Sequence, residues 1–408
     1  MSLIVQKYGG SSVAGPARIK RVAERVKRYK KKGHALVIVV SALGDTTDEL
    51  LELSRQVTRS PSRRELDMLM STGEQASVAL LAMALHELSC DAISFTGAQV
   101  GILTDAAYTR ARIVSVETRR IREELKKNKV VIVAGFQGTN PDGEITTLGR
   151  GGSDLTAVAL AKALSADACE IYTDVEGIFT ADPRLVKTAR KIDRISYEEM
   201  LELASSGAQV MQSRSIEVAG KFDIPVHVRS SFSNKEGTWI VKEDRSMEGV
   251  LIRGVSVNRD EAKLTVTAVP NRPGVAGKIF RTLADGGVNV DMIIQNIGKH
   301  ASTDISFTVP KSDAEPAVKL LRKIAGKMGF RDVSFDANIA KVSVVGVGMR
   351  SHAGVAAGMF EALGKNGINI EMISTSEIKI SCVVKKSDAE KAVRLLHDEF
   401  ISGKKPKK

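Results

Sequence analysis

Cysteine, aromatic side chains and long apolar runs are scarce in this sequence of 408 residues, and each scarcity excludes a class of protein. Its three cysteines, Cys90, Cys169 and Cys382, lie far apart and form no CxxC or cysteine–histidine spacing, which excludes a disulfide framework and a zinc site. No run of about 18 apolar residues occurs, so we expect no membrane span. Lys7 and a glycine pair interrupt the first apolar run, so we expect no signal peptide and a cytoplasmic location.

Aromatic residues make up only 4% of the chain, so its cores must be built from Val, Ile, Leu and Ala. The formal net charge of +12 raises the question of nucleic acid, but much of the excess lies in two runs, at 27–32 and 404–408. No aromatic platform for stacking bases interleaves with either run, so we expect no nucleic-acid partner. The positive field of such a protein still favours an anionic substrate.

The first 240 or so residues alternate short apolar runs with helical patterns. Strands are predicted at 3–7, 36–40, 130–134, 170–173 and 225–228, and helices over 16–30, 65–88 and 153–165. Continuous β-branched runs separated by helices indicate an α/β fold with a mainly parallel sheet covered on both faces. Ligands bind such sheets beyond the carboxyl ends of the strands.

An internal repeat begins near residue 260. Residues 272–276 and 287–292 recur 80 positions later, and residues 311–314 recur 75 positions later. Each copy reads strand, glycine turn, helix, strand, strand, helix, which indicates two paired small domains rather than a solenoid. Residues 230–260 are interpreted as the connector.

The first segment with chemical potential is the turn after the first strand, where Lys7 is followed by Gly9 and Gly10. Two glycines let the backbone approach a ligand, and the following helix adds positive potential that suits phosphate. The spacing of a P-loop is absent. A plain tight turn is the alternative interpretation.

A second segment, Thr147 to Asp154, also precedes a helix. Arg150 can bind a carboxylate or a phosphate in bidentate fashion, and Gly151 and Gly152 open the backbone. Asp154 is expected in the first helical turn, either as a cap or as the residue that positions Lys7 and Arg150.

A third segment, residues 172–184, follows a buried strand and carries two carboxylates, Asp174 and Asp182. Both are suited to loop capping, or to a nucleotide with its metal. Elsewhere, Ser41 ends the second strand, Asp45, Thr46 and Thr47 follow it, and Glu74 is expected near a helix start, where it can bind an ammonium group.

Together these segments resemble the aspartate kinases of the amino acid kinase family. The matching motifs are KYGGSSV at 7–13, SALGDTTDEL at 41–50, STGE at 71–74, SFTGAQVGI at 94–102, GFQG at 135–138, TTLGRGGSD at 146–154 and YTDVEGIFTADPR at 172–184. Both C-terminal repeats resemble ACT domains, which bind small amino acids at their interfaces.

The resemblance implies a three-layer α/β/α kinase domain over residues 1–245 and two ferredoxin-like (βαββαβ) ACT domains over 260–335 and 340–402. It implies transfer of the γ-phosphoryl group of ATP to the β-carboxylate of L-aspartate, the first step toward lysine, threonine and methionine. Mg²⁺ is expected to be held mainly through ATP, without a protein metal site.

By the same resemblance, Lys7, Arg150 and Asp154 are the catalytic residues. ATP is expected to contact Lys7, Gly9, Gly10, Ser41, Thr173, Asp174, Phe179, Asp182 and Arg184. Aspartate is expected to contact Asp45, Thr46, Thr47, Glu74, Arg150, Gly151, Gly152 and Ser153. Gln209 stands where the family often has a lysine that reaches the nucleotide.

The ACT pair implies feedback by lysine, threonine or both. The expected effector contacts are Asn271, Gly274, Val275, Ala276, Asn289 and Gln295 in the first repeat, and Met349, Arg350, Val355, Ala356 and Ser376 in the second. The pair also implies a homo-oligomer, and Met247 can begin a shorter ACT-only subunit. Two alternatives remain: a kinase for another substrate, such as glutamate or a nucleoside monophosphate, and a non-catalytic amino-acid sensor.

Overall fold

The computed structural model describes residues 2–208, 210–244, 250–297 and 302–402, and the chain divides into two compact units. The first unit comprises residues 1–179, 191–204 and 209–247. The second comprises residues 180–190, 205–208 and 248–408, so the chain enters the second unit twice before remaining there.

The first unit is built on an eight-stranded sheet in which only the pair β11 and β12 is antiparallel. The predicted mainly parallel sheet is therefore confirmed. Its strands, in spatial order, are β10 (Arg194–Ser196), β12 (Thr238–Val241), β11 (Val226–Ser230), β9 (Ala168–Thr173), β1 (Leu3–Tyr8), β2 (Ala35–Val40), β6 (Val130–Ala134) and β3 (Ala92–Phe95).

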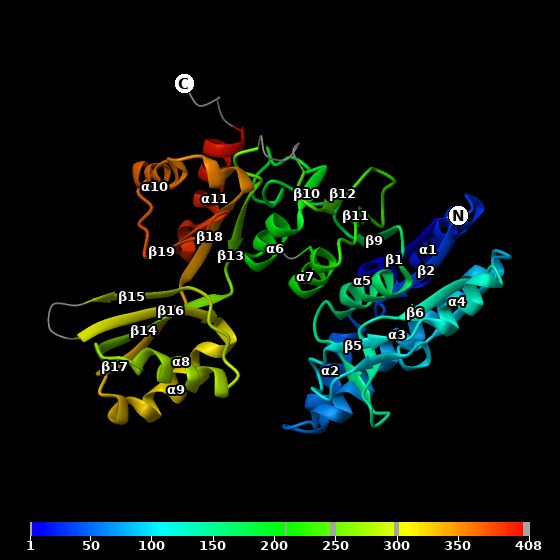
Figure 1. The fold of residues 1–408 in the computed structure, drawn as a ribbon, viewed down its shortest axis with the longest axis horizontal. Helices are drawn as coiled ribbons and strands as arrows, with labels where there is room; N and C mark the ends of the chain where they lie inside the picture. Colours follow the sequence, from blue (N-terminus) through cyan, green and yellow to red (C-terminus); the bar gives the residue numbers. More distant parts are fainter. Residues whose placement is uncertain (1, 209, 245–249, 298–301, 403–408) are drawn as a thin grey trace. The chain divides into compact units, whose positions relative to one another are not determined.

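Helices cover both faces of this sheet (Figure 1). Leu36 and Ile38 of β2 point to one face and join the core beneath α1 (Pro16–Lys31) and α3 (Arg63–Glu87). On the other face, α5 (Gly152–Leu164) packs on β1, β2 and β9, and α7 (Ser213–Lys221) packs on α5. These are the three layers that the resemblance predicted.

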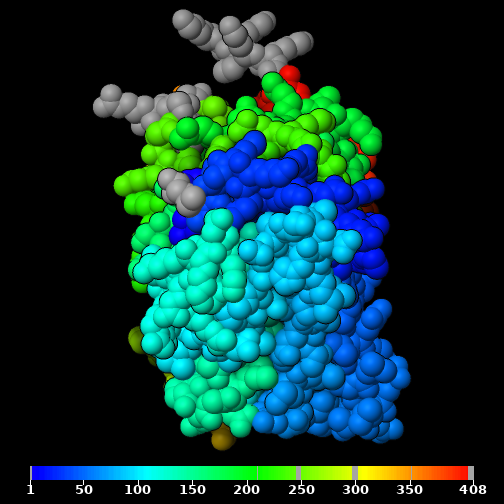
Figure 2. All heavy atoms as spheres, turned by 90° about the vertical axis from the view of Figure 1, so that its right-hand side faces the viewer, coloured from blue at the N-terminus to red at the C-terminus, as the bar shows by residue number. Residues whose placement is uncertain are grey.

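Smaller elements extend this unit. A four-stranded sheet has the order β5 (Ile113–Val116), β4 (Ile102–Thr104), β7 (Gln137–Thr139), β8 (Ile145–Thr147). The remaining helices are α2 (Thr46–Val57), α4 (Arg119–Lys126) and α6 (Tyr197–Ser205). Figure 2 shows a side of this unit where α1, in dark blue, and light-blue to cyan segments form the surface.

Helix α3 is long and apolar enough to cross a membrane by length and composition, although half of its most apolar stretch is buried in the fold. Leu81 and Leu85 are fully buried in the core that α3 shares with α1. The apolar character of α3 therefore suits a core helix.

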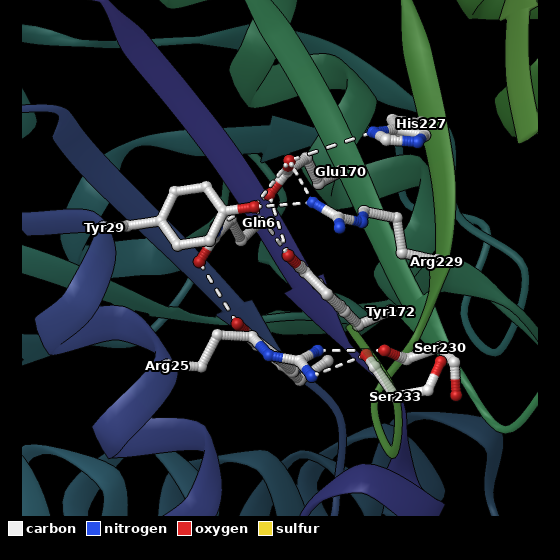
Figure 3. A network of polar contacts seen from close by, with 10 residues as sticks. Gln6, Arg25, Tyr29, Glu170, Tyr172, His227, Arg229, Ser230 and Ser233 are labelled. Atoms are coloured by element: carbon white, nitrogen blue, oxygen red, sulfur yellow. Dashed lines mark hydrogen bonds and ion pairs between the residues drawn. The ribbon is translucent and has the colours of Figure 1, made fainter. Parts of the chain in front are cut away.

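Buried polar side chains tie three central strands to α1 (Figure 3). The Glu170 carboxylate of β9 accepts hydrogen bonds from Gln6 of β1 at 2.7 Å, Tyr29 of α1 at 3.0 Å and Tyr172 at 3.1 Å. Arg229 of β11 completes its shell at 3.4 Å. Because every oxygen of this buried carboxylate has partners, its charge is compatible with the core.

The neighbouring side chains extend this network. His227, stacked on Trp239 with ring centroids 4.0 Å apart, is buried, and burial lowers its pKa to about 4. Arg25 lies over the Tyr172 ring and donates to the carbonyls of Ser230 and Ser233 at 2.9 and 3.0 Å (Figure 3). Helix α1 is thereby fixed to the loop that follows β11.

The first repeat forms a four-stranded antiparallel sheet in the second unit, with two helices on one face (Figure 1). In chain order its elements are β14 (Glu261–Pro270), α8 (Val275–Asp285), β15 (Ile293–Ile297), β16 (Ser302–Pro310), α9 (Lys311–Met328) and β17 (Asp332–Asp336). This is the expected βαββαβ order.

The second repeat completes its sheet differently. Its own strands are β18 (Ile339–Val345), β19 (Met372–Thr375) and β20 (Lys379–Lys385), with helices α10 (Val355–Lys365) and α11 (Ala389–His397). The fourth position, beside β18, is taken by β13 (Gly254–Asn258). Residues after α11 continue as a helical turn, Asp398–Ser402, so the free edge of β18 pairs with a strand from before the first repeat.

The interpretation of residues 230–260 as a connector was therefore wrong, because this segment supplies β12 to the first unit and β13 to the second. The first ACT repeat is inserted between β13 and the rest of the second repeat. Ala181 and Val186 also lie in the core of the second repeat, with Val255 of β13.

Candidate functional site

A cavity of about 520 Å³ lies beyond the carboxyl ends of β1, β2 and β6. This is the edge at which parallel sheets bind ligands. Of the residues singled out from the sequence, it brings together Lys7, Gly10, Ser41, Thr47, Glu74, Arg150, Gly151, Gly152 and Ser153.

Lys7 and Asp154 form an ion pair of 2.7 Å at the cavity wall. Lys7 comes from the end of β1, and Asp154 lies in the first turn of α5, as predicted. Both side chains are largely shielded from solvent, so the pair is firmly placed. A carboxylate that holds an ammonium group in this way orients a positive charge toward a phosphoryl group.

Two glycine turns let the backbone approach this charge. A Cβ atom on Gly10 would lie 2.8 Å from the carbonyl oxygen of Gly44. A Cβ atom on Gly152 would lie 2.8 Å from the Leu148 side chain. Both positions therefore require glycine. Gly152 also begins α5, and the N-terminus of an α-helix stabilises anions.

Glu74 lies in the middle of α3, and its expected place near a helix start was wrong because α3 already begins at Arg63. One carboxylate oxygen accepts the Ala42 N–H at 3.1 Å, and the other is buried without a partner among the described residues. Burial raises the pKa of Glu74 to about 7. A buried acceptor that faces a cavity is suited to an ammonium group.

Arg150 is almost fully exposed, and its guanidinium lies 3.4 Å from the Asp48 carboxylate of α2. Such an exposed pair is weak and is readily exchanged for another carboxylate. Glu74 and Arg150 thus provide the cavity with one group for an ammonium ion and one for a carboxylate.

Several residues expected around the nucleotide do not line this cavity, namely Gly9, Thr173, Asp174 and Phe179. Thr173 is the last residue of β9 and Asp174 follows it, and the Gly9 N–H donates to the neighbouring Tyr172 carbonyl at 3.2 Å. Asp45 precedes α2 and Thr46 begins it. Phe179 pairs with Lys191 in the same unit.

Asp182 and Arg184 belong to the second unit, where they form an ion pair of 2.7 Å. Hydrogen bonding to Arg184 lowers the pKa of Asp182. Their contact with ATP stays a prediction. Gln209 lies outside the described residues.

The sequence interpretation assigned no role to ten of the residues that line the cavity. Leu66 and Met70 precede Glu74 at intervals of four, which places all three on one face of α3. This spacing could have predicted that Leu66 and Met70 lie near Glu74. Thr109 lies outside every matching motif, whereas Phe136 lies in the GFQG motif at 135–138 but was given no role. The ten residues are Ala42, Gly44, Asp48, Leu51, Arg63, Leu66, Met70, Thr109, Phe136 and Gly149.

A second cavity, of about 370 Å³, lies within the first ACT repeat at the start of α8. Among the predicted effector contacts, Asn271, Gly274, Val275, Ala276 and Gln295 line it, whereas Asn289 is an exposed residue outside its lining. In the second repeat, Met349 and Arg350 lie in the turn before α10, Val355 and Ala356 begin that helix, and Ser376 follows β19.

Comparisons with known proteins identify the family and relatives of the chain. Residues 2–230 match the amino acid kinase family, and residues 265–324 and 342–400 match ACT domains. An aspartate kinase of Stutzerimonas stutzeri is 53% identical over 98% of this chain and 97% of its own length. An aspartokinase of Mycolicibacterium smegmatis is 52% identical over 99% of this chain and 97% of its own length.

Solved structures give the same result. Aspartokinase III of E. coli in complex with aspartate and ADP superposes with a TM-score of 0.84 at 27% identity, over 97% of this chain and 99% of that one. The same enzyme in complex with lysine and aspartate gives a TM-score of 0.77 at 27% identity, over 98% and 99%.

Proposed function

The chain belongs to the amino acid kinase family and carries two ACT domains, and we propose that it phosphorylates the β-carboxylate of L-aspartate with ATP. One observation carries the proposal: a single cavity joins the Lys7–Asp154 pair to a buried free carboxylate oxygen and a guanidinium. The first suits a phosphoryl group, and the other two suit the charged groups of an amino acid.

The chemistry follows from these charges. Lys7 stabilises the negative charge on the transferring phosphoryl group, and the glycine turns at Gly9–Gly10 and Gly151–Gly152 bring backbone amides to the nucleotide and the substrate. Glu74 receives the α-ammonium group and Arg150 receives a carboxylate. The attacking β-carboxylate is already anionic at neutral pH, so no general base is required.

Magnesium enters the proposal with the nucleotide. The described residues include no group of three or more His, Cys, Asp or Glu side chains placed to hold a metal. Bound through ATP, Mg²⁺ neutralises phosphate charge, and Asp174 is the carboxylate beside the Gly9 turn that suits a Mg²⁺–nucleotide complex.

Regulation is proposed through the ACT repeats, with lysine, threonine or both as effectors. The cavity at the start of α8 has backbone amides at a helix N-terminus for an effector carboxylate. We also propose a cytoplasmic homo-oligomer that provides the first intermediate for lysine, threonine and methionine. A shorter ACT-only subunit would begin at Met247, which lies outside the described residues.

The test is ADP release by the purified protein with ATP, Mg²⁺ and a panel of acceptors. We expect turnover with L-aspartate and inhibition by lysine, threonine or their mixture. Faster turnover with L-glutamate or a nucleoside monophosphate would replace aspartate as the substrate. Binding of lysine or threonine without turnover on any acceptor would instead identify an amino-acid sensor.

A further inference from the structure

The loop that carries Arg150 has little intrinsic rigidity. It joins β8 to α5, and Gly149 and Gly151 on either side of Arg150 have φ values of 80° and 71°. The Arg150 side chain is 94% exposed, so packing does not fix it. Its position at the cavity must therefore be set by whatever holds the backbone of the loop.

Asp67 of α3 holds this loop from one side. Its carboxylate is fully buried and accepts the N–H of Thr147 at 3.0 Å and the Thr147 hydroxyl at 2.6 Å. The same carboxylate accepts the N–H of Thr109 at 3.0 and 2.9 Å. Thr109 lines the cavity and has a φ of 68°, a conformation that a non-glycine residue keeps only when its surroundings hold it.

Arg214 of α7 holds the same two segments from the other side. Its two terminal nitrogens donate to the carbonyls of Leu148 and Ala111, each at 3.1 Å. The segments also bond to each other, because the Ala111 N–H donates to the Thr147 carbonyl at 2.8 Å. The Asp67 carboxylate thus accepts hydrogen bonds from backbone N–H groups of both segments, and the Arg214 guanidinium donates to backbone carbonyls of both.

Stability alone does not account for this arrangement. A buried carboxylate bonded only to neutral donors is costly, and burial raises the pKa of Asp67. Apolar residues would hold a loop at lower cost but would not fix its backbone atom by atom. Asp67 also shares α3 with Glu74, two turns further along, so one rigid helix sets both the ammonium partner and the carboxylate partner.

We propose that Asp67 and Arg214 are positioning residues for the acceptor substrate: they clamp the 147–151 loop so that Arg150 stands at a fixed place relative to Glu74. This inference rests on aspartate as the acceptor. It assigns neither residue a contact with ATP or with the reacting atoms.

The clamp acts on acceptor binding. When its hydrogen bonds are removed, a smaller fraction of the molecules has the loop in the binding-competent arrangement. The apparent affinity for aspartate falls in proportion to that fraction. In Asp67→Asn, one acceptor oxygen is replaced by a donor that faces backbone N–H groups. We expect the KM for aspartate to rise by about tenfold or more, with kcat and the KM for ATP changed less than about threefold.

The matched control is Glu87→Gln, the same chemical change at the exposed end of α3. Thr147→Val removes only the hydroxyl bond and should raise the KM for aspartate, whereas Thr147→Ser keeps the bond and should restore the wild-type value. Arg214→Met should resemble Asp67→Asn, and Arg214→Lys should recover part of the effect.

Three results decide the matter. A selective rise in the KM for aspartate, with rescue by serine at 147, supports the clamp. An equal loss across kcat and both KM values in folded Asp67→Asn, or a wild-type KM for aspartate in Thr147→Val and Arg214→Met, overturns it. If the wild-type protein itself lacks aspartate-dependent turnover, the proposed function fails instead. If Asp67→Asn does not fold, the Thr147 and Arg214 variants decide alone.

Discussion

Single residues at the cavity carry charges that the fold has placed in advance. The Lys7–Asp154 pair is held by β1 and α5, so the ammonium group does not need to be recruited during the reaction. This preorganisation is the main means by which enzymes stabilise charge that develops in a transition state.

Replacing Lys7 by alanine should abolish most turnover without unfolding the protein. Loss of one preorganised charge lowers kcat by about 10²–10³. Circular dichroism should still report the wild-type fold, because α5 and β1 keep their other contacts. Near-normal turnover in the folded variant would remove Lys7 from the proposed mechanism.

Glu74 should make aspartate binding depend on pH. Its pKa of about 7 means that the carboxylate is partly protonated at neutral pH, and only the charged form attracts an ammonium group. The KM for aspartate should therefore rise as the pH falls from 8 to 6, while the KM for ATP stays level. Initial-rate measurements at each pH test this, and a flat KM for aspartate would contradict it.

The same residue should cost stability at high pH. A carboxyl whose pKa is raised by folding stabilises the fold while it is protonated, and this contribution is lost as the pH rises through about 7. Glu74→Gln should thus be more stable than the wild-type protein at pH 8, by up to about 3 kcal/mol, with the difference shrinking toward pH 5. Urea titrations at the two pH values measure it.

The residues that line or support the cavity differ in how well the sequence alone predicts their role. Lys7, Gly10 and Gly152 stand in contiguous motifs at the ends of strands, where local geometry requires them. Asp67 and Arg214 bond mainly to backbone atoms of segments distant in sequence. Every residue has the same backbone atoms, so the residue types in those segments do not indicate these bonds. Such partners can be found only once the loops are placed in space.

Secondary-structure elements are joined by polar contacts as well as by apolar packing. Glu170 links β9 to β1, β11 and α1 (Figure 3). The predicted strands at 36–40 and 130–134 agreed with the structure because their continuous β-branched runs fit a sheet buried on both faces. β13 was missed because its five residues, GVSVN, are short and half polar.

Glu170→Gln should destabilise the first unit. The substitution leaves the largely shielded Arg229 without its anion, and an uncompensated buried charge costs about 3–5 kcal/mol. Glu176→Gln, which breaks the exposed pair with Lys235, should cost less than about 1 kcal/mol. Chemical denaturation of both variants tests this, and equal losses would show that the Glu170 network does not stabilise the unit.

At the scale of the whole molecule, β13 decides where the regulatory unit begins. It completes the sheet of the second repeat, and Val255 is almost fully buried there. A fragment of residues 247–408 includes β13, whereas a fragment beginning at 260, the predicted boundary, exposes the edge of β18. Both fragments lack residues 180–190 of the second unit, so the absence of this segment does not affect the difference in stability between them.

The longer fragment should be more stable by about 2 kcal/mol or more, since β13 buries Val255 and a row of backbone hydrogen bonds. Thermal unfolding of the two fragments compares them directly. Val255→Ser in the longer fragment should remove part of this difference, and equal melting temperatures of the two fragments would mean that β13 adds nothing to the sheet.

The insertion of one repeat inside the other also fixes the order in which the chain can mature on the ribosome. β13 emerges early, but its partner β18 is made only after the entire first repeat, about 80 residues later. At about 5–20 residues per second, an unpaired strand waits for several seconds while the inserted domain folds beside it. The second ACT sheet is thus the last sheet to form, because its strands can all pair only after most of the chain has been synthesised.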